Sequence, residues 1–208
     1  RVRANLSRAL AAIDLLPSSL SQVWQVHSAE IVRADSPNGA GSPVKADGMV
    51  TAQPALSLLM RFADCVPILV FDPVRIAIGV GHAGWLGTVR GVSIELVRAM
   101  VREFSSRPED LIAGLGPSIG PDHYPVGPDV VAQVEAAFGA HSSQLLLPRD
   151  GQVVLDLWLA NRWQLESTGI GSVEVAGICT ACNLADWYSH RGERGQTGRF
   201  GAVLALNA

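Results

Sequence analysis

Several features that define common protein classes are scarce or missing in this sequence. Its 208 residues include only three cysteines, an odd and low number that argues against a disulfide framework and favours a reducing compartment such as the cytoplasm. Charged residues make up 17% of the chain, the net charge is −3, and no basic run indicates nucleic-acid binding. No apolar stretch approaches the roughly 20 residues of a membrane-spanning helix, because Asp, Arg or His interrupts each one. We therefore expect a cytoplasmic protein that binds neither nucleic acid nor membranes.

The length and hydrophobicity of the chain suit a single folded domain. Hydrophobic residues account for 48% of the 208 residues, which is enough for a sizeable core. Neither an internal repeat nor a linker divides the sequence, so we expect one domain over residues 1–208. The first residues do not have the pattern of a signal peptide. The chain begins with Arg1 instead of Met, which leaves open a preceding N-terminal segment.

Hydrophobic periodicity predicts a mixture of helices and strands. Helices are expected over residues 2–15, 129–138 and 157–166, with a further one after Trp85 whose apolar face runs from Val89 to Phe104. Strands are expected at residues 23–32, 46–51, 56–60, 68–71, 76–80, 111–115, 153–155, 173–178 and 200–206. A Pro/Gly/Ser loop is expected at 36–43. This mixture predicts an α/β or α+β domain with a mixed sheet.

An apolar hairpin with a potential metal ligand at each end is the most informative local pattern. Cys65 precedes the apolar run 68–71, and His82 follows the run 76–80. The Pro-containing turn between the runs is too short for a crossover helix, so the strands should be antiparallel. Antiparallel pairing brings the start of the first strand beside the end of the second. We therefore expect Cys65 and His82 to lie close together.

His27, at an expected strand edge, is a third candidate for the same site. Zinc accepts thiolate and imidazole ligands, and a catalytic zinc keeps three protein ligands and an open fourth position. The spacing of His27, Cys65 and His82 is not that of a zinc finger. Residue pattern alone also permits a buried free cysteine and two hydrogen-bonded histidines.

Two further patterns have competing interpretations. The pair Cys179 and Cys182 lacks both a second Cys pair and a redox-type βαβ context, which favours small buried thiols. The polar, Gly-rich stretch 188–199 contains three arginines and is either a solvated loop or a clamp for an anion.

Taken in order, these blocks resemble the YfiH-like, laccase-domain family, whose members are also described as polyphenol oxidoreductases and purine nucleoside phosphorylases. The matching blocks extend over nearly the whole chain. They are residues 25–27, 46–51, 63–67, 81–85, 116–121, 124–126, 179–182, 188–191 and 197–199.

The resemblance implies a metal site, a fold and an activity. In the family, zinc is held by the residues that correspond here to His27, Cys65 and His82. The family fold is a single layered α-β-β-α domain with mixed sheets, similar to Cys-His toxin deamidase domains. The implied activity is phosphorolysis of adenosine, inosine and methylthioadenosine, together with adenosine deamination. Some bacterial members are instead linked to editing of a peptidoglycan precursor.

Two positions depart from the family pattern. Leu86 stands where the family usually has Arg, and Leu cannot bind phosphate as a guanidinium does. Arg90 lies one helical turn further on and is a candidate substitute. Asp122 and His123 stand where the family commonly has a Cys pair, which makes His123 a candidate to approach the site.

The leading hypothesis is a zinc-dependent enzyme that acts on a purine nucleoside and phosphate. Cys65 would be a thiolate ligand of the zinc, which polarises a water or phosphate oxygen. Cys65, His82 and Asp64 are the expected catalytic residues, with Gln25 and Asp64 orienting groups or exchanging protons. Arg191 and Arg199 are expected to contact the anion, and with Gln25 they form the expected substrate-binding set.

Three alternatives remain open at this point. A copper polyphenol oxidase would use the same Cys/His ligands, but five histidines are too few for a multicopper laccase, so zinc is favoured over copper. A metal-free hydrolase would activate the Cys65 thiolate with His82. A non-catalytic zinc-stabilised module would bind metal without turnover. A homodimer is open in each case.

Overall fold

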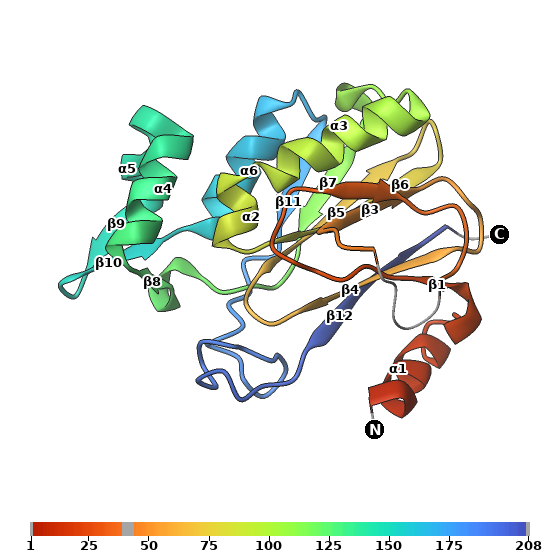
Figure 1. The fold of residues 1–208 in the computed structure, drawn as a ribbon, viewed down its shortest axis with the longest axis horizontal. Helices are drawn as coiled ribbons and strands as arrows, with labels where there is room; N and C mark the ends of the chain where they lie inside the picture. The colour runs from red at the N-terminus through yellow and green to blue at the C-terminus, as the bar shows by residue number, and fades with distance from the viewer. Residues whose placement is uncertain (1, 39–43, 207–208) are drawn as a thin grey trace.

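The computed structural model describes residues 2–38 and 44–206, and most of them form four layers in the order α-β-β-α (Figure 1). The helices are α1 (Val2–Ala11), α2 (Trp85–Val89), α3 (Val92–Phe104), α4 (Pro128–Phe138), α5 (Ser142–Leu145) and α6 (Leu157–Ser167). Helices α2, α3 and α6 cover one face of a six-stranded sheet. A three-stranded sheet packs on its other face, and α1 covers the outside of that smaller sheet. The expected layered α/β class is confirmed.

The six-stranded sheet has the order β11-β7-β5-β6-β3-β2. Its strands are β2 (Ile31–Arg33), β3 (Gly48–Thr51), β5 (Val66–Asp72), β6 (Ala77–Ala83), β7 (Ile112–Leu115) and β11 (Ser172–Val175). The outer pairs β11–β7 and β2–β3 are parallel and the inner pairs are antiparallel, so the sheet is mixed. In the expected β5–β6 hairpin, Pro67 lies opposite His82. This register places Cys65, just before β5, at the end of β6 that carries His82.

The remaining strands form two smaller sheets. The first has the order β1-β4-β12, with β1 (Leu20–Ser21), β4 (Ser57–Phe62) and β12 (Phe200–Ala205). The second has the order β8-β10-β9, with β8 (Pro125–Val126), β9 (Leu146–Arg149) and β10 (Gln152–Leu155). This second sheet lies beside α4 and α5, away from the sheet sandwich (Figure 1). Single-turn 3-10 helices are η1 (Pro17–Ser19), η2 (Pro108–Asp110), η3 (Pro121–His123) and η4 (Gly139–His141).

Three hydrophobic cores hold the layers together, and the smallest lies between α1 and the three-stranded sheet of β1, β4 and β12. Between the helices and the large sheet, Leu96 and Met100 of α3 are fully buried, and each contributes about 2 kcal/mol by leaving water. Between the two sheets, Met49, Met60 and Val80 form part of the second core. Cys65 and His82 lie at the end of the β5–β6 hairpin, where the first two cores give the backbone a fixed position.

The helices follow the sequence prediction with two corrections. The expected long helix after Trp85 is divided into α2 and α3 at Gly91, whose φ of 79° lies in the left-handed region that glycine tolerates. The first helix, expected over residues 2–15, ends earlier, at Ala11, because the chain turns at Asp14 with a φ of 55°. Helices α4 and α6 match the expected ranges within one or two residues.

The strand expected over residues 23–32 is wrong except at its end. Only Ile31–Arg33 forms a strand, and the residues before it curve around the carboxylate of Asp47. His27 in this curve has a φ of 57°, which is incompatible with an extended strand. The loop expected at 36–43 lies partly outside the described residues, since 39–43 are not among them.

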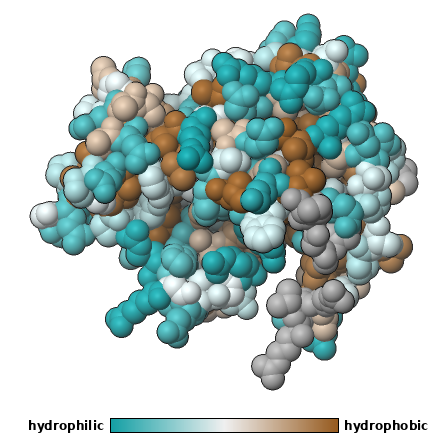
Figure 2. All heavy atoms as spheres, in the orientation of Figure 1, coloured by the Kyte–Doolittle hydropathy of each residue, from teal (hydrophilic) through white to brown (hydrophobic). Residues whose placement is uncertain are grey.

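Polar and apolar residues are interspersed on the face shown in Figure 2. The exposed apolar side chains come from many separate elements, as is usual for a folded domain. In residues 2–38 and 44–206, no helix has the length and apolar character that crossing a membrane requires.

Candidate metal centre

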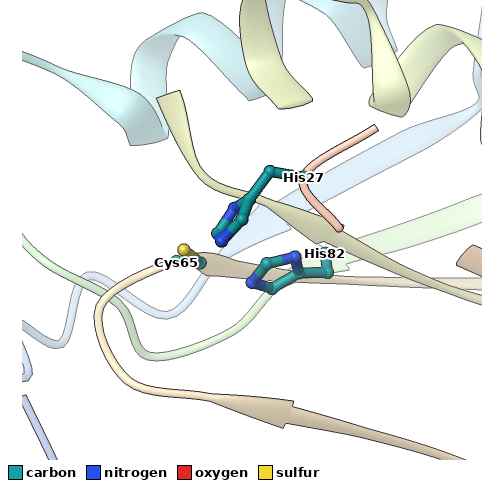
Figure 3. Close-up of side chains that lie close together, drawn as sticks. All are labelled: His27, Cys65 and His82. Carbon is teal, nitrogen blue, oxygen red and sulfur yellow. The ribbon is translucent and has the colours of Figure 1, made fainter. Parts of the chain in front are cut away.

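His27, Cys65 and His82 converge from three separate segments of the chain (Figure 3). One ligand atom from each residue lies within 4.8 Å of the other two, and the two imidazole centroids are 4.9 Å apart. His82 projects from β6, Cys65 from the turn between β4 and β5, and His27 from the loop before β2. The structure therefore brings together the three residues that the sequence proposed as metal ligands.

Asp47, which is fully buried, organises this cluster from behind. Its Oδ1 lies 2.9 Å from Nδ1 of His82. Its Oδ2 accepts hydrogen bonds from the backbone N–H groups of Val26 (3.0 Å) and Ser28 (2.6 Å), and from the Ser28 hydroxyl (2.8 Å). One carboxylate thus fixes both the loop that carries His27 and the orientation of the His82 ring. Because Nδ1 of His82 is engaged, Nε2 is the atom available to a ligand.

The pKa values of these groups reflect burial and mutual attraction. Burial raises the pKa of Asp47, but hydrogen bonds from His82, Ser28 and Val26 outweigh it and lower that pKa to about 2. Burial also disfavours the Cys65 thiolate, yet the charge of His82 and hydrogen bonds from both histidines lower the thiol pKa to about 6. For His82, Cys65 and Asp47 overcome burial and raise the pKa to about 9. The lowered pKa of Cys65 favours its thiolate, the form that binds metals.

Gly84 makes room for the cluster at the start of α2. A Cβ at this position would lie 2.9 Å from Sγ of Cys65 and 3.2 Å from Nδ1 of His27. The first distance is shorter than real Cβ contacts, so any side chain here would displace a candidate ligand.

Asp64 connects the turn that carries Cys65 to the C-terminal part of the chain. Its φ of 82° is in the left-handed region, which costs a non-glycine residue of order 1–3 kcal/mol. Its carboxylate accepts hydrogen bonds from the Thr180 hydroxyl at 2.8 Å and the Arg191 backbone N–H at 2.6 Å. The backbone N–H of Ile119 donates to its carbonyl at 2.9 Å. These bonds hold the strained turn in place.

The cluster lies at a cavity of about 700 Å³. Three arginines, Arg61, Arg191 and Arg199, contribute to its lining. Three aromatic side chains also line it, from Trp24, Trp85 and Tyr124. The guanidinium of Arg191 lies 5.0 Å from the ring centroid of Tyr124 and donates to the carbonyl of Pro125 at 2.9 Å. The cavity therefore combines cationic and aromatic groups beside the Cys/His cluster.

The remaining predicted site residues also line this cavity, although their polar atoms have partners. Gln25 forms two hydrogen bonds with the backbone of Arg61, at 2.8 and 3.0 Å. Arg199 donates to the carbonyl of Gly198 at 2.6 Å. Asp64 uses both carboxylate oxygens as described above.

The two departures from the family pattern have different outcomes. Leu86 lines the cavity, so an apolar side chain occupies that position. Arg90 is not among the residues that line the cavity in the described part of the chain. Its guanidinium instead donates to the carbonyl of His27 at 2.9 Å, which supports the loop of that ligand.

His123 does not join the cluster of His27, Cys65 and His82. Its Nδ1 lies near the sulfur atoms of Cys179 and Cys182 instead. The prediction that both of these thiols are buried is wrong for Cys182, which is exposed. Cys179 is buried as expected.

Sequence reasoning assigned no role to Asp47, Arg61, Tyr124 or His190, although all four belong to the site or its cavity. Asp47 occurs in one of the matched blocks, directly before a glycine and an apolar strand, which is a signal that could have drawn attention to it. Arg61 and His190 reach the cavity only through the tertiary fold.

The donor set fits zinc better than a multicopper centre. One thiolate and two imidazoles are zinc ligands, and a carboxylate behind one imidazole is a common support for such a ligand. All five histidines of the chain lie within the described residues. Only His27 and His82 share this cluster, while His141 lies against Trp163 and His123 near the two other thiols. A trinuclear copper cluster requires many more imidazoles at one place.

A layered mixed α/β fold with one thiol and two imidazoles at the edge of a cavity defines a protein with a candidate Cys/His metal site beside a small-molecule cavity. The family described as multi-copper polyphenol oxidoreductase laccase has a model that matches residues 1–207, and this chain belongs to that family. The family membership expected from the sequence blocks is confirmed.

Individual relatives support this assignment. A purine nucleoside phosphorylase of Deinococcus radiodurans is 40% identical over 205 residues, which cover 99% of this chain and 77% of the relative. The purine nucleoside phosphorylase YlmD of Geobacillus stearothermophilus is 36% identical over 193 residues, covering 86% of this chain and 69% of YlmD. The crystal structure of the hypothetical protein YfiH from Bacillus licheniformis superposes with a TM-score of 0.92 at 32% identity, covering 98% of this chain and 80% of YfiH.

Proposed function

We propose that this protein is a zinc-dependent purine nucleoside phosphorylase. The observation that carries the proposal is the placement of a Cys/His/His donor set at a cavity lined by three arginines. A metal ion held by these ligands would lie beside the positive charge of the arginines. This arrangement suits a substrate pair made of a nucleoside and phosphate. The printed names of the Deinococcus and Geobacillus relatives support the same activity.

His27, Cys65 and His82 would hold the zinc ion. When bound, zinc would supply a positive charge that polarises an oxygen atom of a substrate. Cys65 acts here as a thiolate ligand and not as a nucleophile. A metal binds the neutral imidazole, so metal uptake would displace the ring proton that the raised pKa of His82 favours. Asp47 would keep Nδ1 of His82 oriented and leave Nε2 for the metal.

The arginines would position phosphate for attack on the anomeric carbon. In phosphorolysis, a phosphate oxygen bonds to that carbon as the bond to the base nitrogen breaks, and the base leaves with a proton. Arg61, Arg191 and Arg199 are the candidates for phosphate contacts, since a guanidinium can bind two phosphate oxygens at once. They make up for Leu86, which cannot form such contacts. The volume of about 700 Å³ falls in the usual range for sites that bind small molecules.

The aromatic side chains give the purine a surface on which to stack. Trp24 and Trp85 line the cavity, as does Tyr124, which already stacks with the guanidinium of Arg191. An adenosine, inosine or methylthioadenosine substrate is consistent with this lining, since all three carry a purine ring.

Asp64 and Gln25 take positioning roles in this proposal. Their polar side-chain atoms are bonded to Thr180, Arg191 and the backbone of Arg61. Asp64 would hold the segment of Arg191 against the cavity and would not exchange protons. The cytoplasm suits the chemistry, because reducing conditions keep Cys65 reduced and able to bind a metal, and none of the three cysteines forms a disulfide within the described residues.

Product analysis tests the proposal. Protein of known zinc content is incubated with adenosine, inosine or methylthioadenosine, with and without phosphate, and the products are separated by chromatography. We expect the free base and a ribose phosphate only when phosphate is present. His82→Ala should lose this activity, while His141→Ala, a histidine outside the cavity, should keep it.

Two results would change the conclusion. Inosine formed from adenosine without phosphate would identify deamination as the main reaction. Zinc-loaded protein that leaves all three nucleosides untouched would overturn the proposal and favour a zinc-binding module or an enzyme that edits a peptidoglycan precursor.

A further inference from the structure

We propose that His123, Cys179 and Cys182 form a second metal site, suited to zinc, which is separate from the cluster at the cavity. One ligand atom from each of these residues lies within 4.8 Å of the other two. Nδ1 of His123 is 3.8 Å from Sγ of Cys179 and 3.5 Å from Sγ of Cys182. Two thiols therefore converge on one nitrogen of one imidazole.

These distances match those between ligands of one zinc ion. With Zn–S of about 2.3 Å and Zn–N of about 2.0 Å at tetrahedral angles, a sulfur and a nitrogen ligand lie roughly 3.5 Å apart. Both measured sulfur–nitrogen distances, 3.8 and 3.5 Å, are close to this value. An ion can therefore be placed among the three atoms with little movement. Thiolate sulfur selects zinc over magnesium or calcium.

The local backbone prepares Cys179 for this role. The N–H of Gly120 donates to its Sγ at 3.2 Å, which fixes the position of that sulfur atom. The amide of Asn183 donates to the carbonyl of Cys179 at 2.8 Å, and the backbone N–H of Asn183 donates to the carbonyl of Thr180 at 3.3 Å. These bonds shape the turn from Cys179 to Cys182, so that both thiols lie on the side of the turn that faces His123.

The fourth position of the ion would face solvent. Cys182 and His123 are both exposed, whereas Cys179 is buried. Three protein ligands leave one position for water or for an incoming group. The two thiolates also balance the charge of a divalent cation.

Binding at this site would join two segments that form the cavity. His123 ends η3, and the next residue, Tyr124, lines the cavity. The turn 179–182 contains Thr180, whose hydroxyl donates to Asp64 at the same cavity. Zinc held here would therefore tie the loop of Tyr124 to the loop that supports Asp64. This inference does not depend on the proposed nucleoside chemistry.

Metal stoichiometry tests the second site. Wild-type protein is loaded with Zn²⁺, passed through a desalting column and analysed for zinc by mass spectrometry. We expect two zinc ions per chain in the wild type, one in Cys65→Ser, one in Cys182→Ser and none in the double variant. His123→Ala should also retain one ion, and His141→Ala, its matched control, should retain two.

Cobalt identifies the ligands of the remaining ion. Cys65→Ser protein titrated with Co²⁺ should show a thiolate-to-cobalt charge-transfer band and saturate at one ion per chain. Adding Cys182→Ser should weaken this band, and His123→Ala should lower the affinity for Co²⁺ at least tenfold. Because Cys182 and His123 are exposed, both variants are expected to fold, and circular dichroism checks this. If one variant does not fold, cobalt binding by the other variant tests the proposed ligands.

The proposal is overturned if Cys65→Ser protein binds neither Zn²⁺ nor Co²⁺ in stoichiometric amount. It is also overturned if Cys179 and Cys182 form a disulfide in the isolated protein and, after reduction, still bind no metal, which would identify a redox pair. Two bound zinc ions without nucleoside turnover would support this inference while contradicting the proposed function.

Discussion

The two Cys/His clusters differ in how the fold supports them. His82 of the first cluster projects from a central strand, its side chain is only 6% exposed, and a fully buried carboxylate fixes its ring. The second cluster lies on a 3-10 turn and a loop turn, with two of its three residues exposed. Rigid support and a neighbouring cavity suit a metal that takes part in a reaction. An exposed position between two loops suits a metal that joins them.

Replacing one thiolate in each cluster should give the largest contrast. Cys65→Ser removes a ligand at the cavity, and losing a metal that provides several kcal/mol should lower phosphorolysis by about 10³-fold or more. Cys182→Ser should lower it only a few-fold, because that site acts through the cavity wall. The rate of phosphorolysis at saturating phosphate is measured for both variants. Equal losses in the two variants would contradict the functional division between the clusters.

Asp47→Asn keeps the shape of the side chain and removes its charge. Since the carboxylate orients His82 and the loop of His27, zinc affinity at the first cluster should fall about 10–100-fold. Competition with a chromogenic chelator measures this affinity. The second cluster should keep its zinc. Asp35→Asn, an exposed aspartate paired with Arg33, is the matched control and should change neither affinity. An unchanged affinity in Asp47→Asn would show that backbone contacts alone place the ligands.

Acid should expose the contribution of the Asp47 carboxylate to folding. Its pKa falls from 3.8 to about 2 on folding, so the stability that it provides is present above pH 3.8 and is lost as the pH falls through about 2. The shift corresponds to about 2 kcal/mol. Denaturant titrations of metal-free wild type and Asp47→Asn should show a difference in unfolding free energy that shrinks by about this amount between roughly pH 5 and 2. A difference that does not change with pH would contradict this account.

Arg90→Ala should give the smallest effect. The variant loses a charged hydrogen bond to the carbonyl of His27, worth about 1–2 kcal/mol, so zinc should bind the first cluster roughly 5–30 times more weakly. Arg98→Ala, which removes an exposed arginine of α3 paired with Glu95, is the control. Competition with a chelator measures the zinc affinity of both variants, and only Arg90→Ala should differ from the wild type. If Arg90→Ala abolishes phosphate dependence while zinc binding is kept, Arg90 contacts phosphate after all.

Local pairing decides how much of the site can be predicted from the sequence. Cys65 and His82 flank one hairpin, and antiparallel register brings them together without reference to the rest of the chain. His27 reaches them only because Asp47 bends its loop, which is why the strand expected there is wrong. His123 and Cys179 are 56 residues apart and belong to loops, so no periodicity indicates that they meet.

The positions of the cavity residues required the tertiary fold for a related reason. Residue type and the family blocks predict Arg191 and Arg199 as site residues, and the structure places both at the cavity. They do not predict Arg61 on β4, because an exposed arginine at a strand end has no distinctive pattern. The roles of these arginines stay predictions until substrate contacts are measured.

The long-range bonds of Asp64 have a consequence for the order of synthesis. His27, Cys65 and His82 all leave the ribosome early, together with Asp47 and the hairpin that aligns them. The partners of the Asp64 carboxylate, Thr180 and the Arg191 backbone, follow 116 and 127 residues later. The strained turn that carries Cys65 therefore gains the bonds that hold it only after residues 180–191 have been synthesised. Until then the three candidate ligands are present in the chain, but the turn that must place Cys65 beside His82 is not yet held.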